Sequence, residues 1–157
     1  MRYYMLDRVL EIVPGEKAVG IKAVTLESEV LHDHFPDYPI LPGTLLVEGM
    51  AQLSGFLIEL TRNTPGRVRR AMLVKIEEAK FHNIAGPGDC LTLEALLGDQ
   101  MDDAARTTVR ASVGDVKIAS ATLTFALREV PFPAIHEQRR AIYKIWTRQC
   151  PNTPAIL

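Results

Sequence analysis

The 157-residue chain has little of several features that mark large classes of proteins. Its two cysteines, Cys90 and Cys150, form neither a disulfide framework nor a metal-binding spacing. Eighteen Lys and Arg residues stand against 19 Asp and Glu, and the net charge of -1 gives no general attraction to nucleic acid or anionic membranes. The start, MRYYMLDRV, has no basic-then-apolar leader. These absences predict a cytoplasmic protein that binds neither nucleic acid nor membrane.

The chain also lacks an apolar run that suits a membrane span. The longest such run, residues 44–60, is too short and is interrupted by Glu48, Gln52 and Glu59. There is no internal repeat and no low-complexity segment. A hydrophobic content of 47% over this length is enough for one ordinary domain with a substantial core.

Residues 44–60 are apolar on nearly every side, which is typical of a helix enclosed by other structure. The predicted strands cover residues 6–13, 17–26, 72–81, 90–98, 104–113 and 116–127. Gly114-Asp115, between the last two strands, predicts a tight hairpin turn. One early helix followed by successive antiparallel strands predicts an α+β fold in which a sheet wraps around a helix.

After the last predicted strand, residues 134–149 have helical spacing, and their cations outnumber their anions. We expect an amphipathic helix whose apolar side packs on the body of the protein. The residues expected on that side are Ile135, Ile142, Ile145 and Trp146. The chain is therefore divided into a domain over residues 1–130 and a helical extension over residues 131–157.

The enclosed helix carries carboxylates along one side. Glu48 and Gln52 are four residues apart, and Glu59 lies near the same line about three turns after Glu48. A charged group in apolar surroundings is costly, and burial favours the protonated carboxyl that a general acid needs. The alternative is a buried carboxyl that a cap or an ion pair satisfies.

The loop before this helix is stiffened by Pro36, Pro39 and Pro42, each of which restricts its own backbone and that of the preceding residue. Pro42 and Gly43 open the helix, so the Gly43 N–H lies at its positive end without an intrahelical partner. Such an N–H can bind an oxyanion. His34, at the start of the loop, titrates near neutrality and can act as a base.

Other interpretations of these residues were weighed. His32 and His34, with Asp37, suggest a metal site, but no third and fourth ligand occur at a recognisable spacing, so no metal is expected. His34 alone would more often be a structural loop histidine. Ser54 lies within the helix without the surroundings of a nucleophile elbow, which disfavours a serine hydrolase.

The string HFPDYPILPGTLLVEGMAQ, residues 34–52, resembles the signature of the 3-hydroxyacyl-acyl-carrier-protein dehydratases of fatty-acid synthesis, which have the hotdog fold. LDRVLEI, residues 6–12, is similar to the first strand of that family. IEEAKFHNIAGPGD, residues 76–89, resembles its helix-facing strand and the turn that follows. The resemblance runs through roughly the first four fifths of the chain, and typical members stop near the last strand.

The resemblance implies dehydration of a (3R)-3-hydroxyacyl thioester to the trans-2-enoyl thioester, in fatty-acid synthesis or a related polyene or polyketide route. His34 would be the base at Cα, oriented by the backbone carbonyl of Ile40. Glu48 would protonate the leaving 3-hydroxyl and be held by Gln52. The Gly43 N–H would polarise the thioester carbonyl.

No cofactor or metal is implied, and the substrate would arrive on the phosphopantetheine of an acyl carrier protein. Family members place the histidine of one subunit beside the acid of the other, which implies a homodimer or a trimer of dimers. Two interpretations of an arginine run remain open, a solvated face or a docking surface for the acidic carrier. The run comprises Arg62, Arg67, Arg69 and Arg70.

Three further points are open on the sequence alone. Asp37 stands where relatives usually have glycine, beside the loop through which substrate would enter. The C-terminal helix either serves as a structural cover or adds cations for carrier docking. Hotdog thioesterases and non-catalytic dehydratase-like subunits are the alternatives to a dehydratase. The HFP loop disfavours a thioesterase, and the filled catalytic positions disfavour a non-catalytic subunit.

Overall fold

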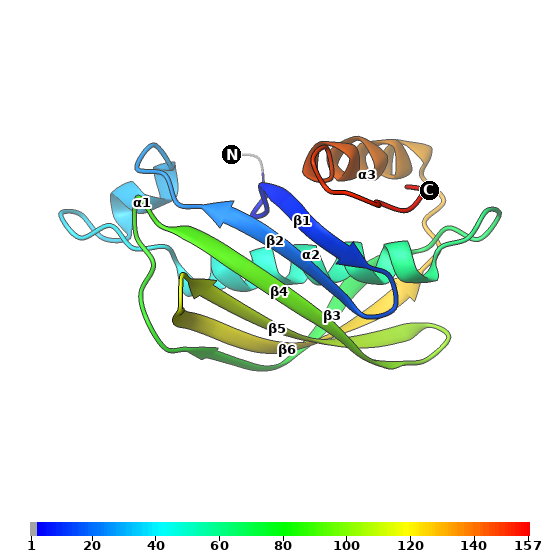
Figure 1. The fold of residues 1–157 in the computed structure, drawn as a ribbon, viewed down its shortest axis with the longest axis horizontal. Coiled ribbons are helices and arrows are strands. Elements are labelled where there is room, and N and C mark those ends of the chain that lie inside the picture. Colours follow the sequence, from blue (N-terminus) through cyan, green and yellow to red (C-terminus); the bar gives the residue numbers. More distant parts are fainter. Residues whose placement is uncertain (1–2) are drawn as a thin grey trace.

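The computed structural model describes residues 3–157, which form one sheet wrapped around a long helix (Figure 1). The elements are β1 (Arg8–Val13), β2 (Lys17–Ala23), α1 (Glu29–Asp33), α2 (Gly43–Arg62), β3 (Arg70–Phe81), β4 (Cys90–Gln100), β5 (Ala104–Val113), β6 (Val116–Arg128) and α3 (Pro133–Trp146). The strands pair antiparallel in the order β1-β2-β4-β5-β6-β3. This confirms the predicted hotdog fold. The sequence did not predict the short helix α1.

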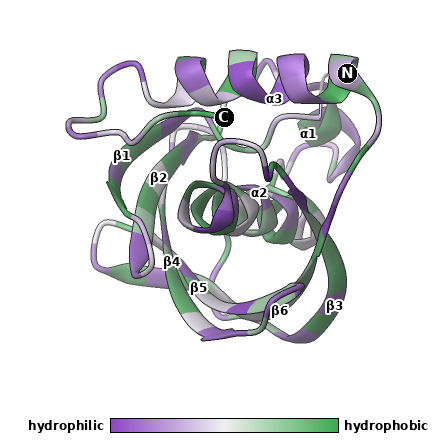
Figure 2. Ribbon diagram, turned by 90° about the vertical axis from the view of Figure 1, so that its right-hand side faces the viewer, coloured by the Kyte–Doolittle hydropathy of each residue, from purple (hydrophilic) through white to green (hydrophobic). Residues whose placement is uncertain are grey.

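The helix α2 is the centre of the core. Seen end-on in Figure 2, it lies within the curve of the sheet. Leu53, Phe56 and Leu57 are fully buried against the strands, as the all-round apolar pattern predicts. Burial of each such side chain stabilises the fold by about 1.5–3 kcal/mol. No helix within residues 3–157 has the length and apolar character needed to cross a membrane.

Strands β4, β5 and β6 form the middle of the sheet and have one face buried toward α2. Their inward positions alternate with outward ones, as expected for a sheet with one buried face. The inward residues include Leu91, Leu93, Ala95, Val109, Ala111, Ala121, Leu123 and Phe125. The predicted hairpin between β5 and β6 is present, since Val113 pairs with Val116 and Gly114 takes a positive φ of 55° that glycine adopts readily.

Strand β3 is a sheet edge and also faces α2, as the resemblance suggested, with Ala71 near Gly55 and Phe81 near Gly43. Its first residue, Arg70, is buried, but Met72, Val74 and Ile76 are exposed. At twelve residues it is twice as long as β1, the six-residue strand at the other edge. A long apolar edge is a surface on which another strand can pair.

The C-terminal helix α3 lies across the side of α2 that the sheet leaves open (Figure 2). The helix is present as predicted, and two of the four residues predicted on its packing side are right, since Trp146 is buried and Ile142 packs against the core. Its buried residues are Tyr143 and Trp146, whereas Ile145 is 63% exposed and Ile135 is also exposed. Aromatic packing sets which side of α3 faces the core, because the Tyr143 ring centre lies 4.9 Å from that of Phe56.

Candidate active site

His34 lies in a loop that fixes the orientation of its ring. The His34 Nδ1–H donates a hydrogen bond of 3.0 Å to the Ile40 carbonyl, and the Ile40 N–H donates to the His34 carbonyl at 2.8 Å. The contact expected from the resemblance is therefore present. Because a carbonyl only accepts, Nδ1 carries the proton, which leaves Nε2 of the neutral ring free to take another. The ring also stacks on Phe35 at 4.4 Å.

Asp37 occupies the tip of the same loop with a φ of 63°. This is the left-handed region, which glycine adopts without steric cost and which aspartate tolerates better than most residues. Phe35 and Tyr38 close the turn around Asp37, since the N–H of each donates to the carbonyl of the other at 3.0 Å. The backbone conformation at Asp37 is thus one that suits the glycine expected at this position from the family resemblance.

Gly43 begins α2, directly after Pro42. Among residues 3–157 the Gly43 N–H donates to no acceptor, so it remains available at the positive end of the helix. A Cβ at this position would lie 2.8 Å from the ring of Phe81. Glycine is therefore required for the close approach of Phe81, and a free donor is left at the loop–helix junction.

Glu48 is half-buried, and Gln52 holds its carboxylate. The Gln52 Nε2 donates to Glu48 Oε1 at 2.9 Å and to the Tyr3 carbonyl at 2.8 Å, while Gln52 Oε1 accepts from the Met5 N–H at 2.9 Å. Both amide hydrogens and the amide oxygen are engaged, which fixes the orientation of Gln52. The sequence analysis missed Tyr3 and Met5, because they act through backbone groups that leave no side-chain signal.

A groove of about 830 Å³ opens beside Glu48 and Gln52. Its remaining lining comes from the N-terminal segment, α2, the start of β3, β6 and α3. These residues are Tyr3, Tyr4, Ala51, Gly55, Glu59, Ala71, Met72, Leu73, Phe125, Ile135, Gln138, Arg139, Ile142, Tyr143 and Trp146. The surface of the groove is thus polar and apolar in about equal parts.

The two candidate catalytic side chains do not meet within one copy of the chain. Among residues 3–157 no hydrogen bond or ion pair joins His34 to Glu48, and His34 does not line the groove. In the same part of the chain, no three His, Cys, Asp or Glu side chains gather closely enough to hold a metal ion. A single copy therefore presents the acid and the base at separate places.

Glu59, on the same side of α2 as Glu48, has a different environment. Its carboxylate is buried and accepts from Arg70 Nη1 at 2.6 Å, the Ala71 N–H at 3.0 Å and the Tyr143 hydroxyl at 2.9 Å. Burial, and then the negative charge of Glu59, raise the pKa of Tyr143 well above its usual range, so its hydroxyl remains a donor. Glu59 joins α2, β3 and α3 and is the satisfied buried carboxyl.

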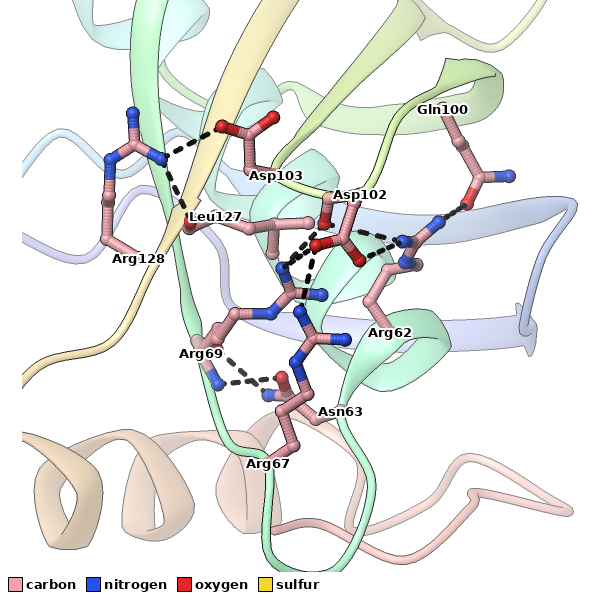
Figure 3. A network of polar contacts seen from close by, with 9 residues as sticks. All are labelled: Arg62, Asn63, Arg67, Arg69, Gln100, Asp102, Asp103, Leu127 and Arg128. Atoms are coloured by element: carbon pink, nitrogen blue, oxygen red, sulfur yellow. Dashed lines mark hydrogen bonds and ion pairs between the residues drawn. The ribbon is translucent and has the colours of Figure 1, made fainter.

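The four arginines of the run Arg62, Arg67, Arg69 and Arg70 separate into two groups. Arg70 is buried against Glu59 and cannot form part of a surface. Figure 3 shows the other three gathered around Asp102 in the turn after β4, where Arg67 Nη2 donates to Asp102 Oδ2 at 2.9 Å. The hydrogen bond from Arg67, and then the positive charges of Arg67, Arg69 and Arg62, lower the pKa of Asp102.

Of these three arginines, only Arg67 is well exposed, at 52% of its side chain. The Arg69 guanidinium is buried, and the Arg62 side chain is largely covered. A continuous basic surface over all four positions is therefore absent, because two of the four side chains tie parts of the fold together.

Residues 1–122 match the model of a family described as a FabA-like domain. The chain is 36% identical over 127 residues to the 3-hydroxyacyl-(acyl-carrier-protein) dehydratase FabZ of Thermoanaerobacter sp. (strain X514), a match that covers 81% of this chain and 88% of that protein. Among solved structures, Cj0977, a sigma28-regulated virulence protein from Campylobacter jejuni, superposes with a TM-score of 0.65 at 16% identity, over 83% of this chain and 82% of that one.

The dehydratase heterocomplex ApeI:P from Xenorhabdus doucetiae superposes with a TM-score of 0.55 at 20% identity, covering 71% of this chain and 88% of that one. Structural similarity at such low identity supports the fold alone. The sequence matches carry more, because they extend through His34, Gly43, Glu48 and Gln52. The chain belongs to the FabA-like family.

Proposed function

We propose that the protein dehydrates (3R)-3-hydroxyacyl thioesters of acyl carrier protein to trans-2-enoyl thioesters, a step of fatty-acid synthesis. Its relatives at 33–36% identity are named for this reaction. The observation that carries the proposal is a pair of oriented groups within the matched segment. His34 is held by the Ile40 carbonyl with Nε2 free, and Glu48 is held by Gln52 at the edge of a groove.

In the proposed reaction His34 is the base. Its Nε2 takes the proton from Cα of the substrate, and the electron pair left at Cα delocalises into the thioester carbonyl. The Gly43 N–H, which donates to no other group among the described residues, would stabilise the negative charge that develops on that oxygen. The hydrogen bond to Ile40 keeps Nε2 directed at the substrate as the ring becomes cationic.

Glu48 is the proposed acid. Its protonated carboxyl gives a proton to the 3-hydroxyl as the bond from C3 to oxygen breaks, so the leaving group departs as water and a Cα–Cβ double bond forms. Gln52 holds one carboxyl oxygen through Nε2, which leaves the other free to face the hydroxyl. The cycle closes when the Cα proton on His34 is returned to Glu48 through solvent.

This scheme needs a second copy of the chain, because His34 and Glu48 lie apart in one copy. The exposed apolar edge of β3 offers the pairing surface, and Met72 and Leu73 belong both to that edge and to the groove beside Glu48. A partner paired on β3 would bring its own loop toward this groove. We propose a homodimer with shared sites, from which a trimer of dimers can be built.

Elimination of water requires a base, an acid and an oxyanion donor, and no cofactor enters the scheme. The substrate would be carried on the phosphopantetheine arm of an acyl carrier protein. Arg67 remains a candidate for docking that acidic partner, since it is exposed. A reducing cytoplasm suits the two free cysteines, Cys90 and Cys150.

One assay tests the reaction. The protein is incubated with a 3-hydroxyacyl thioester while enoyl absorbance and free thiol are followed together. Enoyl product without thiol supports the dehydratase. Thiol release would identify a thioesterase instead, and neither signal, on short or long acyl chains, would identify a non-catalytic member.

The shared site has its own test. His34→Ala and Glu48→Gln should each be inactive, and mixing the two inactive variants under subunit exchange should restore part of the activity, because some mixed dimers contain one intact pair. Failure to restore activity, with exchange verified, would contradict a site built from two copies. Light scattering that finds only monomer at micromolar concentration would contradict it as well.

A further inference from the structure

The helix α3 takes part in the groove although it lies outside the region shared with the family. The family match ends at residue 122, before α3 begins at Pro133. We propose that α3 is a specificity element. The side of α3 that lines the groove includes Ile142, and the Tyr143 hydroxyl holds α3 to Glu59. Together these would limit the length of the acyl tail that the enzyme accepts. This inference rests on the proposed dehydratase function.

One side of α2 forms the floor of the groove. Glu48, Gln52, Gly55 and Glu59 are spaced four, three and four residues apart, which places them along one side of a helix. The distance from Glu48 to Glu59 along the axis is about 16 Å at the usual rise per residue. Gly55, at the middle, has room, since a Cβ there would meet its nearest neighbour at 3.8 Å. The floor is thus a channel that leads away from the proposed acid.

The opposite wall is one side of α3. The groove is lined by Ile135, Gln138, Arg139, Ile142 and Trp146. These positions recur every three or four residues, apart from the adjacent pair Gln138 and Arg139, and so lie on one side of the helix. Ile142 is the half-buried apolar member at the middle of this set. The outward residues of α3 take no part in the lining. The width of the channel therefore depends on the side chain at position 142.

The end of the groove away from Glu48 is held in place by a buried polar network. The Tyr143 hydroxyl and Arg70 both donate to Glu59 Oε2, and the Ala71 N–H donates to Glu59 Oε1. Moving α3 away would take the Tyr143 hydroxyl from Glu59 and the His136 ring from Arg70, and each buried charge would lose a hydrogen-bond partner, which is unfavourable. The wall and the end of the groove are therefore rigid, as a limit on tail length requires.

The acyl tail is the occupant that fits this channel. When the substrate's 3-hydroxyl contacts Glu48, the carbons beyond C3 must leave along a surface next to Glu48, and the groove is that surface. Its lining includes the apolar side chains of Leu73, Phe125 and Ile142, whose contact with an alkyl chain removes apolar surface from water. A tail that reaches the Glu59 end would meet a carboxylate whose hydrogen-bonding capacity is already used, so further length gains nothing.

The test is a chain-length series, from 3-hydroxybutyryl to 3-hydroxypalmitoyl thioesters, measured as kcat/KM. Ile142→Trp should lower kcat/KM for the longest chain relative to the shortest by about 10- to 200-fold, the range typical of a steric change in an apolar pocket. Ile142→Ala should shift the preference toward longer chains. Ile145→Trp is the matched control, the same change on an outward position of the same helix, and should leave the preference within about twofold.

Melting temperature and light scattering accompany each variant, so that a folding or assembly defect is recognised. If Ile142→Trp lowers kcat/KM equally for all chain lengths, or if both Ile142 variants leave the preference unchanged, α3 is not a specificity element. A change of oligomeric state in Ile142→Trp alone would show that a second copy occupies the groove, and would overturn the proposal. Absence of dehydration by the wild type on every chain length overturns the proposed function itself, and the inference with it.

Discussion

Glu48 and Glu59 lie on the same side of α2, yet their surroundings differ. Glu48 is half-buried, contacts the side chain of Gln52, and opens on the groove. Glu59 is 2% exposed and receives three hydrogen bonds, from Arg70, Ala71 and Tyr143. A carboxyl with spare capacity beside a groove can exchange a proton with a substrate. A carboxyl that accepts three hydrogen bonds, one of them from a buried cation, joins elements of the fold.

The comparison teaches that burial alone does not identify a catalytic carboxyl. Glu59 is the more deeply buried of the two, but the groups around it already donate hydrogen bonds to its carboxylate. What distinguishes Glu48 is incomplete satisfaction together with access to a groove. Replacing Glu48 should therefore lower the reaction rate, whereas replacing Glu59 should lower the stability of the fold.

The largest effect is expected from Glu48→Gln. Loss of a positioned general acid typically lowers the rate by about 10²- to 10⁴-fold. The melting temperature should change little, because Gln52 can still donate to an amide oxygen at position 48. Steady-state dehydration and thermal unfolding of the same preparation check both expectations. Turnover close to wild type would remove Glu48 from the acid role.

Glu59→Gln should instead destabilise the fold. It leaves the buried Arg70 guanidinium without a full counter-charge, and breaking a buried ion pair typically costs about 3–5 kcal/mol. Urea unfolding measures the loss. The double variant Glu59→Leu with Arg70→Met removes both charges and should lose less than the two single losses added together. Strict additivity would show that the two charges do not depend on each other.

Tyr143→Phe removes one donor to Glu59 and should cost about 1.5–3 kcal/mol, typical of a hydrogen bond to a charged group. It should also change the pH dependence. Because the pKa of Tyr143 is raised in the folded protein, the unfolded chain loses this proton first, and stability falls as the pH rises above about 10. The phenylalanine variant should show a shallower fall in urea unfolding from pH 9 to 11. An unchanged slope would mean that Tyr143 is not the group responsible.

The smallest effect on stability is expected at Asp102. Like Glu59, this carboxylate has arginine partners, but it is exposed to solvent. Its pKa is lowered in the folded protein, so its contribution to stability is present above about pH 4 and lost as the pH falls further. Asp102→Asn should remove this pH dependence. At high salt the substitution should hardly change the free energy of unfolding, because salt screens exposed ion pairs. Unfolding of both proteins at pH 3 and pH 6, in low and high salt, measures it. A loss as large as that of Glu59→Gln would contradict the distinction between buried and exposed networks.

Much of the candidate site could be predicted from local sequence, since the loop and the start of α2 are contiguous. Proline spacing and the Pro42–Gly43 junction place His34 and Gly43 within one short stretch, and helical spacing pairs Glu48 with Gln52. The contact of His34 with the Ile40 carbonyl was expected from the family resemblance. Local geometry is sufficient for such contacts because few residues separate the partners.

The backbone supports of Gln52 could not be predicted in this way. Met5 and Tyr3 lie 47 and 49 positions away along the chain and contribute peptide groups that every residue carries. The arginine run shows the same limit, because neighbours in sequence point to different parts of the fold. Arg70 turns inward to Glu59, while Arg67 turns outward to Asp102.

The sequence alone predicted the six strands and the two long helices, though not α1, since hydrophobic periodicity reports local backbone geometry. It also predicted that a candidate base, acid and oxyanion donor occur in one stretch. Only the tertiary structure decided that Glu48 faces a groove while Glu59 is enclosed, that Tyr143 rather than Ile145 anchors α3, and that β3 is left as an exposed edge. The physical reason is that these outcomes depend on contacts between residues far apart in the chain, and a helix with apolar residues on every side does not reveal which side will meet which partner.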